Sequence, residues 1–174
     1  MNEELWKKCV DFHGHECPGL AIGFKVCEAV KEKMGIEFSR DEEIVCVTEN
    51  DACAVDAIQV MMGCSFGKGN IVYRNRGKFA FSFFNRKSRE SVRIVFKNFP
   101  RIEDKKVFLE YILNAEADEL FNYKHPNFDI PERAVIFDSI PCEICGEKTA
   151  ENRMRIMNGK KVCLDCFKDY SRGW

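Results

Sequence analysis

The amino-acid sequence predicts an α+β protein with a mixed or antiparallel sheet, helices packed on that sheet, and a small C-terminal zinc ribbon. Three observations lead to this prediction. Apolar residues in the first half recur at helical spacing around one short apolar run that is typical of a buried strand. Further strand-like runs follow, with polar turns between them. The C-terminal segment then carries two closely spaced pairs of cysteines.

The first half is predicted to contain three helices and one strand. A glycine and two histidines interrupt the first helical pattern, and Pro18 suits the first turn of the second helix. Gly35 is a suitable C-terminal cap for that second helix. The third helix begins at Asn50 or Asp51, directly after the strand. The predicted ranges are 2–12, 18–35 and 50–63 for the helices and 44–48 for the strand.

The second half is predicted to begin with strands and to end in the ribbon. Residues 71–74, 79–84 and 92–96 are predicted to be antiparallel neighbours, and residues 107–120 show helical spacing. Two prolines make residues 122–133 suitable as a linker, and residues 134–137 are predicted to form a short strand. We therefore expect a core domain at 1–125, a linker at 126–140 and a four-cysteine zinc ribbon at 141–174.

Composition indicates a folded protein whose cysteines are reduced. Of the 174 residues, 45% are hydrophobic and 32% are charged, so there is a core to bury. No apolar stretch approaches the roughly 20 residues that cross a bilayer, and we expect a cytoplasmic protein without a membrane partner. Because cytosolic thiols are kept reduced, the ten cysteines point to metal ligands or reactive thiols rather than disulfides.

Positive charge is concentrated in the middle of the chain. Residues 68–106 hold 12 basic and 3 acidic side chains, whereas residues 1–67 hold 6 and 13. Clustered positive charge attracts anions, including nucleic acid. However, the phenylalanines at positions 79, 81 and 83 alternate as they would on the buried face of a strand. We therefore expect a solvated positive surface and do not expect nucleic-acid binding.

The C-terminal cysteines have the spacing of a tetrahedral metal site. Two C-x2-C pairs are separated by 17 residues, and Asn158-Gly159 predicts a hairpin between them. Bound zinc would supply folding free energy on the order of 10 kcal/mol to so small a segment. Four thiolates leave no open position, so we expect a structural zinc, with iron as the alternative. The predicted ligands are Cys142, Cys145, Cys163 and Cys166.

A second group of metal-ligand residue types lies near the start of the chain. His13, His15 and Cys17 are spaced two apart, so their side chains would point the same way in an extended segment. If Cys17 caps the helix that begins at Pro18, the positive end of that helix favours its thiolate form. Such a thiolate is suited to metal binding or to nucleophilic attack.

The rest of this core site is expected around the third helix. Cys53 lies in or near the first turn of that helix, after a strand end, where sites often form. Cys64, in the loop past the other end, is a further candidate ligand. Asp51 and Asp56 are expected to hydrogen-bond to the metal ligands without binding the metal themselves. Imidazole with thiolate suits zinc, so a second zinc ion is predicted here, held by His13 or His15 together with Cys17 and Cys53.

Two further signals have simpler interpretations. The loop from Gly63 to Gly69 lacks the spacing of a P-loop, although its backbone amides and Lys68 could face an anion; a plain turn is the alternative. Cys9, Cys27 and Cys46 lie on apolar faces and are predicted to pack as small hydrophobes.

Three stretches carry a resemblance to a known family. These are FHGHECPGLAIG at 12–23, ENDACAVDAIQVMMGCSFGKGN at 49–70, and the cysteine-rich tail. In them the sequence resembles FmdE, the family of the E subunit of formylmethanofuran dehydrogenase. The resemblance implies an α+β core domain with a zinc-binding domain, in proteins linked to the methanogenesis-related molybdenum or tungsten enzyme that reduces carbon dioxide onto methanofuran. We expect a homodimer or one component of a larger enzyme complex.

Three hypotheses for function follow. In the first, the core zinc keeps an open position and acts as a Lewis acid or activates water. In the second, the chain is a regulatory or interaction protein whose core senses metal or redox state and whose ribbon docks a partner or nucleic acid. In the third, Cys17 is the nucleophile of a thiol enzyme, with His13 or His15 as its base.

Overall fold

The computed structural model describes residues 2–99 and 102–170. The chain divides into two compact units, residues 1–134 and residues 135–174, and the division falls inside the predicted 126–140 linker. Arg101 of the predicted basic segment and residues 171–174 of the predicted ribbon lie outside the described residues. No helix in the described part of the chain has the length and apolarity that a bilayer span requires.

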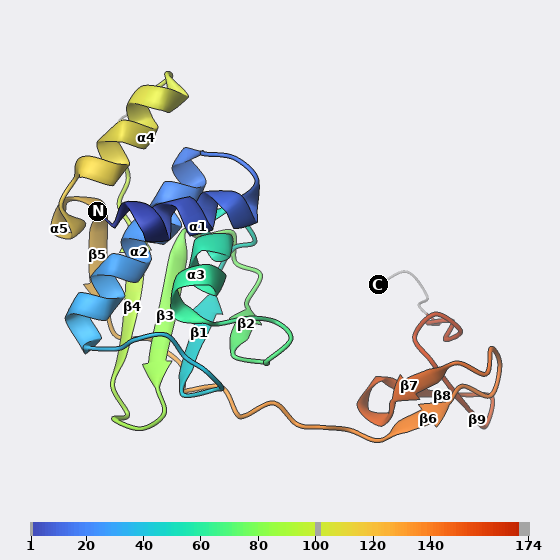
Figure 1. The fold of residues 1–174 in the computed structure, drawn as a ribbon. Coiled ribbons are helices and arrows are strands. Elements are labelled where there is room, and N and C mark those ends of the chain that lie inside the picture. The colour runs from blue at the N-terminus through green and yellow to red at the C-terminus, as the bar shows by residue number, and fades with distance from the viewer. Residues whose placement is uncertain (1, 100–101, 171–174) are drawn as a thin grey trace. The chain divides into compact units, whose positions relative to one another are not determined.

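The N-terminal unit is a mixed five-stranded sheet with helices on one face (Figure 1). The strand order is β2-β1-β3-β4-β5. The helices are α1 (Glu3–His13), α2 (Pro18–Met34), α3 (Ala54–Met62), α4 (Lys105–Asn114) and α5 (Ala117–Leu120). The strands are β1 (Ile44–Thr48), β2 (Ile71–Tyr73), β3 (Ala80–Asn85), β4 (Ser91–Phe96) and β5 (Phe121–Lys124). This architecture confirms the predicted α+β class.

Strand β2 runs parallel to β1, whereas β3, β4 and β5 each run antiparallel to the preceding strand in the sheet. The sequence prediction made β2 an antiparallel neighbour of the later strands, and this was wrong. The reason is that α3 connects β1 to β2 as a crossover helix and brings the chain back to the end of the sheet where β1 began, so that β2 runs in the same direction. The carboxyl ends of β1 and β2 therefore lie at the same end of the sheet.

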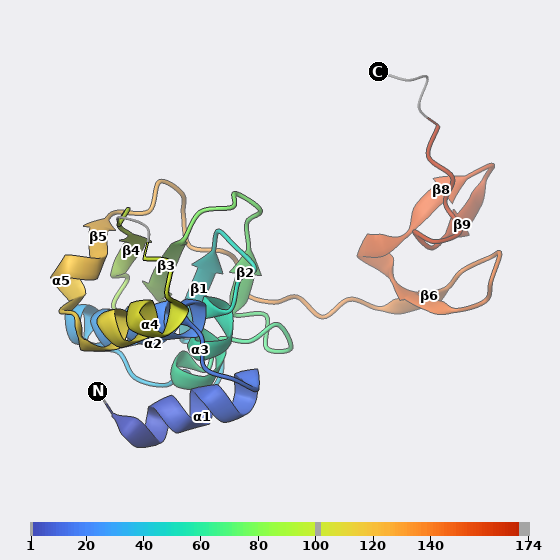
Figure 2. The same cartoon turned by 90° about the horizontal axis from the view of Figure 1, so that it is seen from above.

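Side chains alternate between the two faces of the sheet, so the strands contribute to a large apolar core on the helix side and a small one on the other side. Phe81 and Phe83 point to the helix side, where they are fully buried with Phe24 of α2. Val45 and Val47 point to the other side, where residues 125–134 cross the sheet (Figure 2). We call residues 125–134 the strap.

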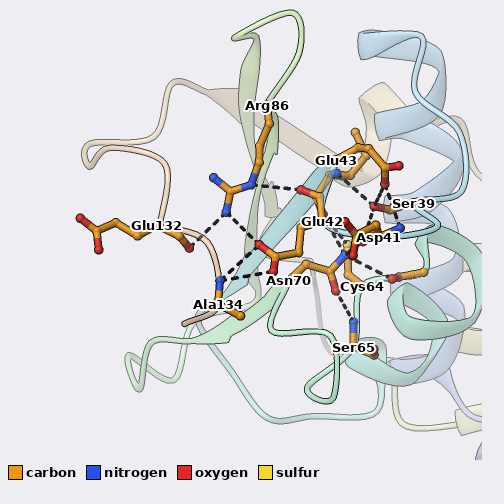
Figure 3. Close-up of polar contacts among 12 residues, drawn as sticks. Ser39, Asp41, Glu42, Glu43, Cys64, Ser65, Asn70, Arg86, Glu132 and Ala134 are labelled. Carbon is orange, nitrogen blue, oxygen red and sulfur yellow. Dashed lines mark hydrogen bonds and ion pairs between the residues drawn. The ribbon is translucent and has the colours of Figure 1, made fainter. Parts of the chain in front are cut away.

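The strap belongs to the N-terminal unit although most of it was predicted to be linker. Phe128 and Ile130 pack against the small core on the sheet face away from the helices. Arg86 donates to the carbonyl of Glu132 at 3.1 Å, and the amide of Ala134 donates to the carboxylate of Glu42 at 3.3 Å (Figure 3). The chain is therefore tied to the sheet as far as residue 134.

The predicted helix at 107–120 is two helices, α4 and α5. Ala115 and Glu116 are extended, with ψ of 150° at each, and Glu116 forms a capping box with Glu119 that starts α5. This local side-chain exchange overrides the continued apolar spacing. Strand β5 follows at once and occupies residues that had been assigned to the linker.

The C-terminal unit consists of two hairpins with little apolar core. Its elements are β6 (Ser139–Pro141), β7 (Lys148–Ala150), the 3-10 turn η1 (Glu151–Arg153), β8 (Arg155–Met157) and β9 (Lys160–Val162). The hairpin predicted around Asn158-Gly159 is confirmed, with both residues at positive φ. The strand predicted at 134–137 is wrong, because strand pairing begins only at Ser139. Ile136 is almost fully exposed.

Candidate metal centres

The four tail cysteines converge on one point. Their sulfur atoms all lie within 4.8 Å of one another, and those of Cys145 and Cys163 are 3.8 Å apart. Two thiolates on one tetrahedral zinc ion lie about 3.8 Å apart, given a Zn–S distance of about 2.3 Å. The arrangement therefore fits a closed four-thiolate site.

The surroundings of the cluster lower the pKa of Cys142 and raise that of Cys166. Cys142 Sγ accepts backbone N–H groups of Ile144 at 3.5 Å and of Cys163 at 3.3 Å. Backbone hydrogen bonds, at Cys145 and then at Cys163, lower the pKa of Cys142 to about 6. Hydrogen bonding to the side chain of Cys163 raises the pKa of Cys166 to about 12. All four sulfurs can be negative together only if a cation lies between them, and zinc would supply it.

A second convergent group lies in the N-terminal unit. One ligand atom each of His13, Cys17 and Cys53 lies within 4.8 Å of the others, and His13 Nε2 is 3.7 Å from Cys17 Sγ. All three side chains are partly buried. Residues from distant parts of the sequence are thus brought to one point, as the sequence predicted for Cys17 and Cys53.

Three helix ends create this point. His13 is the last residue of α1, and Gly14 turns the chain with φ of +93°. Cys17 is the N-cap of α2, and its sulfur accepts the N–H of Leu20 at 3.3 Å. Cys53 is the N-cap of α3. Both sulfurs therefore belong to residues that begin a helix.

Two glycines of α2 allow α3 to come this close. A Cβ on Gly23 would lie 2.2 Å from the carbonyl oxygen of Ala54, so no larger residue fits there without displacing α3. A Cβ on Gly19 would lie 3.1 Å from the Cβ of Cys53. The spacing between Cys17 and Cys53 thus depends on backbone contact between the two helices.

Asp56 holds the imidazole of His13 from behind. Its Oδ2 lies 2.7 Å from His13 Nδ1, and Gln59 donates to its Oδ1 at 3.3 Å. With Nδ1 donating to this carboxylate, Nε2 is left as the acceptor that faces Cys17. A carboxylate on the far nitrogen is the usual partner of a histidine that binds zinc. Asp56 was among the residues expected in this role.

Burial raises the pKa of Cys53, and its neighbour Cys17 adds to the effect by hydrogen bonding and by charge. Two adjacent thiols therefore resist ionising together when no cation is present. A cation between them removes that repulsion.

His15 lies beside this group without joining it. Its side chain is exposed, and its ring stacks on that of His13 with centroids 4.6 Å apart. The spacing of His13, His15 and Cys17 suggested an extended segment, but His13 ends a helix and Gly14 turns away. The structure thus brings His13, and not His15, close to Cys17 and Cys53, and metal binding by His13 stays a prediction.

Cys64 does not join the group, contrary to the sequence expectation. It is fully buried, and its thiol donates to the carbonyl of Ile44 at 3.6 Å (Figure 3). Burial raises its pKa to about 12. The prediction failed because Cys64 follows the far end of α3, a whole helix away from Cys53. Cys9, Cys27 and Cys46 are fully buried, which confirms that they pack in the core.

Lys68 is directed toward protein groups. Its ammonium donates to the carbonyl of Ser39 at 2.7 Å and lies over the ring of Phe38. The neighbouring Asn70 donates from its amide to the carbonyl of Ile44 at 2.9 Å. These bonds hold the 63–70 loop as an ordered turn, and anion binding by Lys68 stays a prediction.

A cavity of about 350 Å³ opens in front of His13 and Cys53. Asp51 and Asp56 line one part of it. Sequence reasoning did not identify its other walls, because they come from separate segments without a shared motif. They are Thr48, Asn50, Ala52, Val55, Gln59, Phe66 and Tyr73. A small molecule in this cavity would contact the metal group directly.

Comparisons with known proteins agree with this two-part organisation. Residues 12–125 match the family described as "FmdE, Molybdenum formylmethanofuran dehydrogenase operon". Residues 136–172 match the prokaryotic dksA/traR C4-type zinc finger. The first match contains all three core ligand candidates, and the second contains all four tail cysteines.

Two individual proteins are similar over nearly the whole chain. A crystal structure of a tungsten formylmethanofuran dehydrogenase FmdE-like protein from Syntrophus aciditrophicus superposes with a TM-score of 0.68 at 25% identity, covering 94% of this chain and 90% of that one. A probable S-adenosyl-L-methionine-binding protein from Archaeoglobus fulgidus is 30% identical over 95% of this chain. This chain spans about half of that relative, 53% of its length.

Proposed function

Because this chain belongs to the FmdE family and ends in a C4-type zinc finger, we propose that it is a two-zinc protein whose core ion meets a small molecule. The core ion is held by His13, Cys17 and Cys53. The tail ion is held by the four cysteines and has a structural role. The chain acts in the setting of formylmethanofuran dehydrogenase, as an accessory protein or a separate relative.

One observation carries the core site: the chain of contacts from Asp56 through His13 to Cys17. The carboxylate fixes Nδ1 at 2.7 Å, and Nε2 faces a sulfur 3.7 Å away. A histidine that served only packing would not need its ring oriented by a carboxylate toward two thiols. This arrangement supports a metal ligand whose tautomer and direction are fixed in advance.

Three protein ligands leave one tetrahedral position for water or substrate. Zinc held by these three ligands would act as a Lewis acid or lower the pKa of a bound water. The 350 Å³ cavity in front of His13 and Cys53 provides space for the ligand. Asp51 is exposed and lines this cavity, so it would contact a molecule bound there.

Zinc stoichiometry of the full chain tests the core site. The double variant Cys17→Ser/Cys53→Ser should lose one of two zinc equivalents, whereas Cys64→Ala should keep both, because Cys64 points into the core. Loss of zinc only from tail variants, with the double variant still holding every equivalent, would refute the core site.

Cobalt in place of zinc tests the open position. Addition of a small exogenous ligand should change the spectrum of the core ion and leave the four-thiolate ion unchanged. A core spectrum that no added ligand perturbs would contradict the proposal of an accessible ion.

The thiol-enzyme alternative predicts a different result from the same geometry, in which His13 would serve Cys17 as base. Bound metal should protect Cys17 from alkylation if the sulfur is a ligand. Equally fast alkylation with and without metal would favour the thiol enzyme.

The C4 finger gives the interaction hypothesis a specific basis. The exposed side chains of Ile144, Ile156 and Leu164 could contact a partner, in the complex or elsewhere. Self-association or assembly into a larger enzyme complex stays a prediction, which light scattering of the purified full chain would test.

A further inference from the structure

A second cavity, of about 270 Å³, lies on the face of the sheet away from the helices. Its walls come from β4, β5, the residue after β1, the loop between β2 and β3, and the start of the strap. The strap crosses that face of the sheet in Figure 2. We call it the cationic cavity. Its positively charged side chains are Arg74, Arg76, Lys78, Arg93 and Lys124.

The sheet register places two of these charges opposite each other. Arg93 of β4 pairs directly with Lys124 of β5. Like charges at directly opposed positions destabilise a sheet. Their juxtaposition is unfavourable unless negative charge beside them balances both.

The loop between β2 and β3 adds two more cations. The carbonyl of Glu49 accepts the backbone N–H groups of Arg76 at 3.3 Å and of Lys78 at 3.2 Å. Gly77 between them has φ of +64°, which lets the loop fold back on the end of β1. Arg74 is fixed as well, because its guanidinium stacks on Phe128 of the strap, 4.1 Å from the ring centre.

Protein groups neutralise only part of this charge. In the described part of the chain, Glu49 is the one carboxylate that lines the cavity. It is only 5% exposed and accepts two hydrogen bonds from Arg93, at 2.6 and 2.9 Å. The pKa of Glu49 is lowered, first by this bond and then by the charges of Arg93, Lys78 and Arg74. With Glu49 ionised, five positive side chains and one negative one leave an excess of four positive charges.

We propose that the cationic cavity binds a phosphate or diphosphate group of a small molecule. An anion with several charges would balance the cavity, and arginine donates to phosphate in a fork geometry. The volume of about 270 Å³ is slightly smaller than that of typical small-molecule sites, roughly 300–1,000 Å³, and suits a small anionic group. A nucleic acid would instead need a longer basic track.

This site is separate from the metal group, although both lie at the carboxyl end of β1. Thr48 and Asn50 line the cavity of the metal group, whereas Glu49 between them lines the cationic cavity. Alternation along the chain thus directs neighbouring residues to opposite faces of the sheet. Failure of either proposal leaves the other standing.

The test is a titration of the full-length zinc protein with pyrophosphate, followed by NMR of backbone and arginine side-chain N–H groups. Signals of Arg74 and Arg93 should shift and saturate at one equivalent. Lys78→Gln/Lys124→Gln should weaken binding about tenfold or more, because hydrogen bonds to charged groups are lost. Lys87→Gln/Lys106→Gln, with the same change in net charge at exposed positions, should change affinity less than about twofold.

Three controls separate the outcomes. Zinc content is measured before and after, because pyrophosphate can also remove metal, and Cys17→Ser/Cys53→Ser should bind pyrophosphate as the parent does. No saturable shift at millimolar pyrophosphate, or equal weakening in both lysine double variants, would overturn the proposal. A single-stranded oligonucleotide that displaces pyrophosphate and binds more tightly than it would overturn it in favour of nucleic acid.

Discussion

The core group and the tail group both contain cysteine sulfurs but are built differently. In the tail, four sulfurs surround one point, and the apolar core beside them consists of Cys142, Val162 and Cys163 with a few partly buried neighbours. In the N-terminal unit, three ligand atoms lie on a large apolar core that exists without them. We therefore expect the tail to need its ion to fold, and the N-terminal unit to fold without one.

The second difference is what surrounds the ligands. In the tail, the Cys142 sulfur accepts the N–H of Ile144 from its own C-x2-C pair and the N–H of Cys163 from the other pair, so short segments around the two pairs create the site. The candidate core ligands are positioned by the Asp56 carboxylate, which Gln59 holds in turn, and by the close packing of α2 and α3. A site built by tertiary structure can leave a position open, because its geometry does not depend on completing the coordination sphere.

The largest effect should follow from removing a tail ligand. Cys145→Ser should unfold residues 139–166 locally, since structural zinc contributes on the order of 10 kcal/mol, and NMR should show the N-terminal unit unchanged. Ile144→Ser, at the adjacent exposed position, should retain the folded tail. A tail that stays folded without zinc would remove the contrast between the two groups.

The next effect tests the helix contact that positions the core ligands. Gly23→Ala should destabilise the N-terminal unit by about 3 kcal/mol, because overpacking at a backbone contact forces α2 and α3 apart. Thermal unfolding measures the loss, and zinc content should show weakened core binding. Gly67→Ala, where an added Cβ meets nothing within 4 Å, is the matched control. Equal stability of the two variants would contradict the account.

Removing the carboxylate behind His13 should affect one ion only. Asp56→Asn should weaken core zinc binding by about tenfold to 100-fold, the usual cost of losing such a partner, without changing the tail. Competition with a zinc-binding dye gives both affinities. Asp51→Asn, which lines the same cavity, should leave zinc affinity near the parent value. The reverse ranking of the two aspartates would show that the supporting role is assigned to the wrong residue.

The smallest effect is a pH dependence confined to the N-terminal unit. The N–H of Asp41, the N–H of Glu43 itself and the hydroxyl of Ser39 lower the pKa of Glu43 from its usual 4.5 to about 2 (Figure 3). A lowered carboxyl pKa adds stability that is present above pH 4.5 and is lost as the pH falls toward 2.

Glu43→Gln should therefore cost about 1 kcal/mol at neutral pH, after allowance for solvent screening. The difference from the parent should shrink through the acid range, as urea unfolding at several pH values would measure. Glu110→Gln, at an exposed position, should show no such dependence. A constant difference at every pH would exclude the proposed hydrogen bonds to the carboxylate.

Local chemistry could be predicted from the sequence, and distant packing could not. The C4 spacing and the hairpin at Asn158 are local, so the tail could be predicted in detail. Cys17 and Cys53 could be paired because each begins a helix. The choice of His13 over His15 depends on one left-handed glycine turn, which spacing alone does not reveal.

The remaining errors also have physical causes. Cys64 was included because cysteine is a common metal ligand, but its side chain points into the apolar core and is fully buried. Strand β2 was given the wrong direction because α3 was not recognised as its crossover. Strand β5 was assigned to a linker because the prolines after it suggested irregular chain. The strap follows β5 and was therefore missed, as was the part of the cationic cavity that Lys124 contributes, whereas the positive charge of residues 68–106 was predicted.

Anomalous X-ray diffraction at the zinc edge, on crystals of the zinc-loaded full chain, tests the central contrast most directly. We predict two zinc peaks. One should be surrounded by the four tail sulfurs, and the other should be bound by His13 Nε2, Cys17 Sγ and Cys53 Sγ with a non-protein atom in the fourth position. A peak in the tail alone, with the core ligands free of metal, would contradict the account.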